Sequence, residues 1–135
     1  MKDKFKEIFE GLKIAYGQYQ KGERGENGKQ GGKAFIVRGN VTDDLWDNHL
    51  RGEGPALGII PITENNTCRW GCIDIDEYDF NHLTFVSKIR ELKLPLIVCR
   101  SKSGGAHVFL FTKKFISASL MQGTLKKMAK ILGYE

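Results

Sequence analysis

Residues 68–112 read CRWGCIDIDEYDFNHLTFVSKIRELKLPLIVCRSKSGGAHVFLFT. Three short apolar runs in this stretch are bounded by turn residues, and they predict strands at 68–76, 96–101 and 106–112. The second run, LIVCRS, is apolar almost throughout, which is typical of a strand covered on both faces. The third run is apolar on both of its faces as well, so we expect Phe109 and Phe111 to be buried.

A helix over 80–93 is expected between the first two strands, with Asp79 as its N-cap and Pro95 beyond its end. Its predicted inward positions are Leu83, Val86 and Ile89. A tight SGG turn at 103–105 then joins the second strand to the third. This order predicts an α+β fold built on a split βαβ, RRM-like sheet with helices packed on it.

The rest of the chain predicts further elements of the same single domain, 1–135. Apolar residues at helical spacing predict an N-terminal amphipathic helix that includes Phe5, Ile8, Phe9, Leu12, Tyr16 and Tyr19. The glycine-rich segment 21–33 predicts a mobile basic loop. Strands are expected at 34–39 and 56–62, with a helix that Thr42 caps between them. A last amphipathic helix is predicted from Met121, Leu125, Met128 and Leu132.

The charge balance favours a polyanionic partner. Lys and Arg number 21 against 16 Asp and Glu, which gives a net charge of +5. The sequence contains no run of 18 or more apolar residues and no secretion signal at its start, so we expect a cytoplasmic protein without membrane contact. Cys68, Cys72 and Cys99 lack a second ligand pair at zinc spacing, and we expect them to be buried free thiols without zinc.

Two acids end the first predicted strand. Asp74 and Asp76 stand two residues apart, so their side chains point to the same face of the strand. Two carboxylates on one face repel each other unless a cation lies between them, and Mg²⁺ binds to a few carboxylates while keeping water and phosphate ligands. The alternative is that both acids end a strand and begin a solvated turn.

The turn SKSGGAH, residues 101–107, is the second chemical feature. Glycines at 104 and 105 let backbone N–H groups approach a phosphate, and Lys102 adds positive charge. The alternative is an ordinary hairpin turn followed by a core histidine, His107. Because the split βαβ brings both features to one face, we expect an acidic metal site beside a phosphate-binding turn, as phosphoryl transfer requires.

These motifs carry a resemblance to a known family. WGCIDID resembles the D-x-D motif of archaeo-eukaryotic primases, and SKSGGAHVFLF resembles their Ser-x-His motif, especially in primase-polymerases of phages and mobile elements. The similarity extends over most of residues 35–112.

The resemblance implies part of a primase-polymerase catalytic core, that is, a template-dependent nucleotidyltransferase. Asp74 and Asp76 would bind Mg²⁺ or Mn²⁺. The triphosphate would contact Ser103, Gly104, Gly105, His107 and Lys102, and His107 would be catalytic with the two acids. The implied partners are nucleoside triphosphates and a DNA template and primer. Basic residues elsewhere that we expect to contact nucleotide or template are Lys29, Lys33, Arg38 and His49, although a solvated basic loop explains the first two equally well.

A third acid completes the metal site in that family, and no residue after Asp79 supplies it plausibly. We therefore expect a chain cut off within the domain, whose missing part comes from a longer protein or a partner chain, and whose own catalysis is uncertain. Two other functions fit the same residues. One is a non-catalytic nucleic-acid-binding module of RRM-like fold, and the other is a metal-dependent nuclease.

Overall fold

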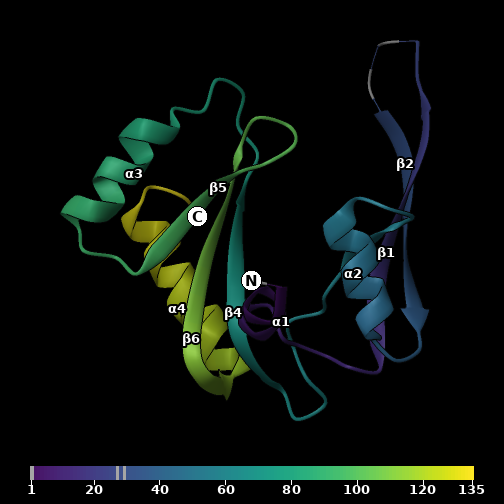
Figure 1. The fold of residues 1–135 in the computed structure, drawn as a ribbon. Coiled ribbons are helices and arrows are strands. Elements are labelled where there is room, and N and C mark those ends of the chain that lie inside the picture. The colour runs from purple at the N-terminus through teal and green to yellow at the C-terminus, as the bar shows by residue number, and fades with distance from the viewer. Residues whose placement is uncertain (1, 27, 29) are drawn as a thin grey trace. The chain divides into compact units, whose positions relative to one another are not determined.

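The computed structural model describes residues 2–26, 28 and 30–135. It divides into two compact units, which we call unit 1 (Met1–Asn65) and unit 2 (Asn66–Glu135). Each unit contains its own three-stranded sheet (Figure 1).

Unit 2 contains the stretch that decides the fold. Its elements follow the order β4 (Thr67–Ile75), α3 (His82–Glu91), β5 (Leu96–Arg100), β6 (Ala106–Ser117) and α4 (Ala118–Ile131). The sheet order is β4-β6-β5, and the central strand β6 is antiparallel to both neighbours. The first and second strands of unit 2 in the chain, β4 and β5, are therefore parallel and separated by β6, which confirms the predicted split βαβ and the α+β class.

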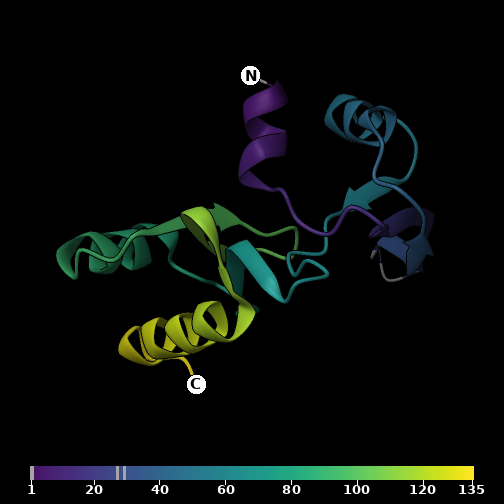
Figure 2. The same cartoon turned by 90° about the horizontal axis from the view of Figure 1, so that it is seen from below.

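The core of unit 2 lies on one face of this sheet. Ala106, Val108 and Leu110 alternate along β6 and are buried against both helices, with α4 lying along this face (Figure 2). The helix residues buried in this core are Phe85, Ile89 and Met121, and Leu132 at the end of α4 joins them. Complete burial of a side chain such as Val108 contributes about 1.5–3 kcal/mol.

The opposite face of the sheet, which we call the helix-free face, carries the intervening residues. Phe109 and Phe111 lie there and are half-buried, and Ile97 of β5 is 55% exposed. Within unit 2, the predictions that the strand at 96–101 is covered on both faces and that Phe109 and Phe111 are buried were therefore wrong. Both helices of unit 2 pack on the face that carries Ala106, Val108 and Leu110.

Helix α3 begins later than its sequence pattern predicted. Asn81, not Asp79, is the N-cap, and its side chain accepts a hydrogen bond from the backbone N–H of Thr84. Asp79 instead takes a positive φ of 57° in the preceding turn. The expectation for Leu83 was wrong, because that side chain is 83% exposed and Phe85 takes the inward position instead.

Unit 1 contains α1 (Lys2–Ile8), β1 (Ala15–Arg24), β2 (Gln30–Arg38), α2 (Asp43–Arg51) and β3 (Ala56–Gly58). Its sheet order is β2-β1-β3, antiparallel throughout. The predicted strand at 34–39 is the second half of β2, whereas the predicted strand at 56–62 is limited to the three residues of β3.

Two predictions for the start of unit 1 were wrong. Tyr16 and Tyr19 lie in β1 rather than in a helix, because pairing with β2 and β3 outweighs their helical spacing. The glycine-rich segment is largely a β-hairpin rather than a loop, since Lys21 pairs with Gly32 across it. Lys29 lies outside the described residues.

Helix α2 begins as predicted. The Thr42 side chain accepts a hydrogen bond from the N–H of Leu45 at 3.3 Å. Trp46 is buried, and the ring of Phe5 meets it edge-on at 6.2 Å between ring centroids. Ion pairs from Lys2 and Lys6 to Asp47 join α1 to α2.

Candidate functional site

Asp74 and His107 face each other across two paired strands. They are direct cross-strand partners, and the His107 Nε2 lies 3.5 Å from the Asp74 Oδ1. The His107 side chain is 45% exposed and that of Asp74 is 73% exposed, both on the helix-free face. Cys99 of β5 pairs with His107 from the other side, so a row of three polar or polarisable side chains crosses the sheet. His107 is thus outside the core, contrary to the alternative of a core histidine.

Asp76 follows the last residue of β4 and reaches the SGG turn. The Ser103 hydroxyl donates to the Asp76 Oδ1 at 3.5 Å, and it lies 3.2 Å from the Ser101 hydroxyl. Ser101 is buried, while Asp76, Lys102 and Ser103 are exposed. The acids at the end of β4 and the turn between β5 and β6 therefore meet, as the split βαβ predicted.

The turn is closed by its own backbone. The N–H of Ser101 donates to the Gly105 carbonyl at 3.1 Å, and the N–H of Gly104 donates to the Ser101 carbonyl at 3.2 Å. Gly104 has a φ of 94°, which an L side chain rarely adopts. Because the Gly104 N–H donates to the Ser101 carbonyl, it forms its hydrogen bond within the turn.

Gly105 is required because the turn presses against the end of β4. A Cβ atom on Gly105 would lie 2.0 Å from the Ile75 carbonyl oxygen and 3.4 Å from the Asp76 Cα. Only glycine permits this approach, and the approach is what places Ser103 beside Asp76. A substitution at this position would separate the turn from the acid.

A second histidine, His82, forms a hydrogen bond with the backbone of the turn. The His82 Nε2 lies 2.8 Å from the Gly105 carbonyl oxygen. Since a carbonyl can only accept, this nitrogen carries the proton. The ring is half-buried and meets the Phe80 ring edge-on at 4.8 Å between centroids. His82 thereby ties the first residue of α3 to the phosphate-binding turn proposed from the sequence.

Cys72 shows how the neighbourhood of Asp74 affects a titratable group. Desolvation, and then the nearby Asp74 and Cys99, raise the pKa of the Cys72 thiol to about 11, against a lowering hydrogen bond from the Val108 backbone. Cys72 is thus a neutral thiol at pH 7. The prediction of burial holds for Cys68 alone, because Cys72 and Cys99 are exposed.

Aromatic rings continue the helix-free face beyond this row. The Phe109 ring stacks on that of Phe111 at 5.7 Å and 23°, and Trp70 and His107 each meet Phe109 at about 6 Å. Polar chemistry is therefore confined to one end of the face and apolar rings to the other.

The donor chemistry at the end of β4 suits a hard divalent cation. Asp74 and Asp76 supply exposed carboxylate oxygens, the ligands that Mg²⁺ and Mn²⁺ prefer. Within the part of the chain that the structure describes, no three or more His, Cys, Asp or Glu side chains converge on one point. A bound ion would thus take its other ligands from water and substrate oxygens.

Residues 15–132 match the model of a family described as the archaeo-eukaryotic primase domain of the TOTE conflict system. The chain belongs to this family. The matched residues include both sheets, so the primase domain spans unit 1 and unit 2. A comparison with curated proteins found no match.

Membership places the primase domain among primase-like nucleotidyltransferases at the level of the superfamily, whose members generally use divalent metals and bind nucleic acid and nucleoside triphosphates. The described helices of the primase domain are too short or too polar to cross a membrane.

Sequence reasoning proposed most residues of the candidate site but did not include His82. The spacing of Asp74, Asp76, Ser103 and His107 around a strand end and a turn was visible in the sequence, and the structure brings these residues together in two pairs. His82 gave no such signal, because it stands 23 positions from Gly105 and its role depends on how α3 begins. His49, predicted to contact nucleotide, accepts a hydrogen bond from the backbone N–H of Leu57 within unit 1.

Proposed function

We propose that this primase domain is a template-dependent nucleotidyltransferase that extends or primes a DNA strand and releases pyrophosphate. The observation that supports this most directly is the meeting of two acids with a glycine turn at one end of the unit 2 sheet. Asp74 pairs with His107, and Asp76 lies beside Ser103. Carboxylates and anion-binding donors at one edge fit the phosphoryl-transfer chemistry of the superfamily.

Asp74 and Asp76 would hold Mg²⁺ or Mn²⁺ in this proposal. The chemistry that such an ion supplies when bound is Lewis acidity toward phosphate oxygens and a lowered pKa for the attacking hydroxyl. The exposure of both carboxylates leaves room for a substrate beside them. Their strand is anchored by the buried Ile75 between them, which keeps both acids at a fixed position on the sheet edge.

The turn and His107 would hold the triphosphate. The Ser103 hydroxyl can donate to a phosphate oxygen in place of Asp76, and the exposed Lys102 adds positive charge at the tip. His107 is placed to donate from Nε2 either to Asp74 or to a phosphate oxygen beside it. Donors of this kind stabilise charge that develops on the phosphates. His82 would act as a positioning residue that keeps the Gly105 carbonyl turned away from the anion.

The test is a calorimetric titration of the whole chain with Mn²⁺. We expect Asp74→Asn to weaken Mn²⁺ binding at least tenfold, because it removes one of two charged ligands. Asp44→Asn is the matched control, since it removes the same charge from an exposed position in unit 1 and should leave binding unchanged. Equal Mn²⁺ affinity in wild type and Asp74→Asn would contradict the proposal.

A product assay separates the remaining functions. Incubation with primed DNA, triphosphates and Mn²⁺ gives longer strands if the domain is a polymerase and shorter strands if it is a metal-dependent nuclease. A non-catalytic module of RRM-like fold would bind nucleic acid on the stacked Phe109 and Phe111 without any change in the strand. Binding that survives Asp74→Asn together with unchanged strands would favour this third function.

A further inference from the structure

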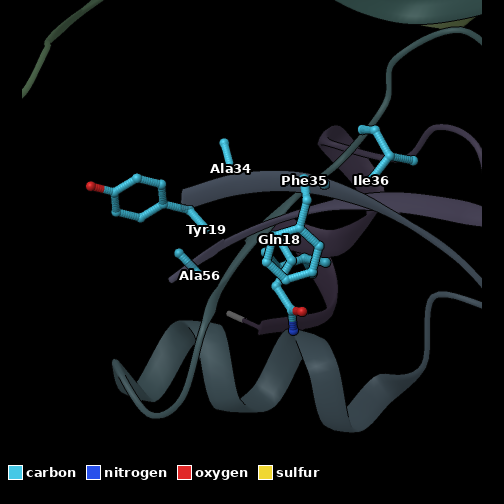
Figure 3. Close-up of a pocket in the computed structure, with 9 residues that line it drawn as sticks. Gln18, Tyr19, Ala34, Phe35, Ile36 and Ala56 are labelled. Atoms are coloured by element: carbon cyan, nitrogen blue, oxygen red, sulfur yellow. The ribbon is translucent and has the colours of Figure 1, made fainter. Parts of the chain in front are cut away.

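The sheet of unit 1 has one face that turns away from α2. Gly17 pairs with both Ile36 and Gly58, and Tyr19 pairs with both Ala34 and Ala56. Cross-strand partners share a face, so these six residues lie on the same side of the sheet. Figure 3 shows Ala34 and Ile36 on the side opposite to the helix toward which Gln18 points. We call this side the outer face of unit 1.

The outer face is apolar, exposed and hollowed. Ile36 is 62% exposed, which is unusual for a residue of its size in the middle of a strand. A hollow of about 340 Å³ lies over the three strands, within the range of about 300–1,000 Å³ that ligand sites occupy. Gly17 and Gly58 face each other across the strands at its floor, and only their lack of side chains keeps it open.

Tyr19 forms a fixed rim of the hollow. Its hydroxyl donates to the Gly31 carbonyl at 3.4 Å. Its ring lies across Gly32, where a Cβ atom would come 2.4 Å from the Cζ of the ring. The aromatic ring is therefore held in place before any ligand arrives, which lowers the entropic cost of stacking against it.

Positive charge stands at both ends of the outer face. Lys21 follows Tyr19 by two residues along β1, and Arg38 follows Ile36 by two along β2, so both share the face of the hollow. Arg38 lies opposite Ala15, and Ala15 is six residues from Lys21 along β1. The backbone positions of the two cations are therefore about 20 Å apart. Between Ala15 and Lys21, and in the described residues that pair with them, this face carries no Asp or Glu.

This combination fits a single-stranded nucleic acid better than a small metabolite. A metabolite site needs several convergent polar groups, whereas this hollow is lined by glycine, alanine and apolar side chains with few exceptions. Strand-binding surfaces join an apolar or aromatic platform, on which a base stacks, to cations that contact phosphates on either side. We propose that the hollow binds an unpaired base of the template strand, and that Lys21 and Arg38 contact backbone phosphates further along that strand, one on each side of the base. This rests on the proposed function, to which it adds the path of the template over unit 1.

The experiment measures fluorescence anisotropy of a labelled 20-nucleotide oligo(dT) with the whole chain across a salt series. Gly58→Val fills the hollow in a strand that accepts β-branched residues, and we expect a loss of affinity on the order of tenfold with an unchanged salt dependence. Lys21→Ala and Arg38→Ala should each weaken binding and lower the salt slope by about one. The matched control is Lys33→Ala. The sequence grouped Lys33 with Arg38 as a template contact, but Lys33 pairs with Gln20 and so lies on the other face of the same hairpin. Lys33→Ala should change the oligonucleotide affinity less than Lys21→Ala or Arg38→Ala does.

Three outcomes would overturn the proposal. One is unchanged oligonucleotide affinity in Gly58→Val with the circular dichroism of the wild type. Another is an effect of Lys33→Ala equal to that of Arg38→Ala, which would indicate a diffuse attraction. The third is a dimer in sedimentation that Gly58→Val dissociates, since a second copy would then be the occupant. Mn²⁺ titration of the same variants keeps this test apart from the proposed function, because variants of the hollow should retain the Mn²⁺ affinity that Asp74→Asn loses.

Discussion

Replacement of Gly105 by alanine tests whether the glycine turn is pressed against the end of β4, the strand that carries Asp74. The added Cβ would lie 2.0 Å from the Ile75 carbonyl oxygen, and real contacts of this kind stay above 3.0 Å, so the turn must move by about 1 Å. Forcing atoms into a packed region costs about 1–3 kcal/mol. Alanine restricts the unfolded chain and recovers about 0.4–1 kcal/mol of this. We expect a net loss of about 1–2 kcal/mol in the free energy of unfolding.

The assay combines thermal unfolding of the whole chain with titration of a nucleoside triphosphate in the presence of Mn²⁺. Gly105→Ala should lower Tm by several degrees and weaken triphosphate binding, because Ser103 moves away from Asp76 with the turn. Gly123→Ala is the control, since this helical glycine has nothing within 4 Å of its Cβ position and alanine there should stabilise α4 by about 1 kcal/mol. A Gly105→Ala variant with unchanged Tm and triphosphate affinity would refute the reasoning.

Three further predictions concern single side chains. His107→Ala should weaken triphosphate binding without lowering Tm, because the ring is outside the core; an unchanged affinity measured by calorimetry would remove His107 from the site. His82→Ala should weaken triphosphate binding and cost about 0.5–1.5 kcal/mol, while His82→Gln should restore much of the affinity by donating to Gly105; equal loss in both would indicate packing alone. The hydrogen bond from Lys2 holds the pKa of Asp47 below its ordinary 3.8, so the ion pair stabilises unit 1 above that pH and is lost as the pH falls through the lowered value. The Tm difference between wild type and Asp47→Asn should therefore shrink as the pH falls below 3.8, and a constant difference would contradict this.

The sequence predicted unit 2 better than unit 1, for a physical reason. In unit 2 the strands are apolar, the turn between β5 and β6 carries two glycines, and the order of elements leaves the split βαβ as the natural arrangement. In unit 1 the same reasoning placed Tyr16 and Tyr19 on a helix, because a spacing of three suits one face of a helix. Pairing with β2 instead puts the two side chains on opposite faces of a strand. The prediction of a loop for the glycine-rich segment was wrong for a similar reason. Its strands are stabilised by pairing between β1 and β2 rather than by the residue types in the segment.

Within the site, residues that act through their own side chains were predictable and residues that act through packing were not. Asp74, Asp76 and His107 are polar groups next to apolar strands, and such a pattern stands out in a sequence. Leu83 and Phe85 are both apolar and two residues apart, so their residue types do not decide which of them is buried; packing against the sheet does, and it also goes with a helix that starts at Asn81 rather than Asp79. With the helix starting at Asn81, His82 contacts the Gly105 carbonyl, and the sequence around His82 does not predict this contact.

The register between β4 and β6 explains why the site lies where it does. Side chains alternate between faces along a strand, so a slip of one residue would bring Asp74 to the core face and the apolar Ile75 to the surface. The pairing is regular from Trp70 to Ile75, and its irregularity lies between Cys68 and Trp70, at the far end of the strand from the acids. The burial of Ile75 and Ala106, which are partners, therefore holds Asp74 opposite His107 on the helix-free face. The hydrophobic core of unit 2 thus positions the acids directly, and core substitutions near Ile75 should affect metal and nucleotide binding before they unfold the domain.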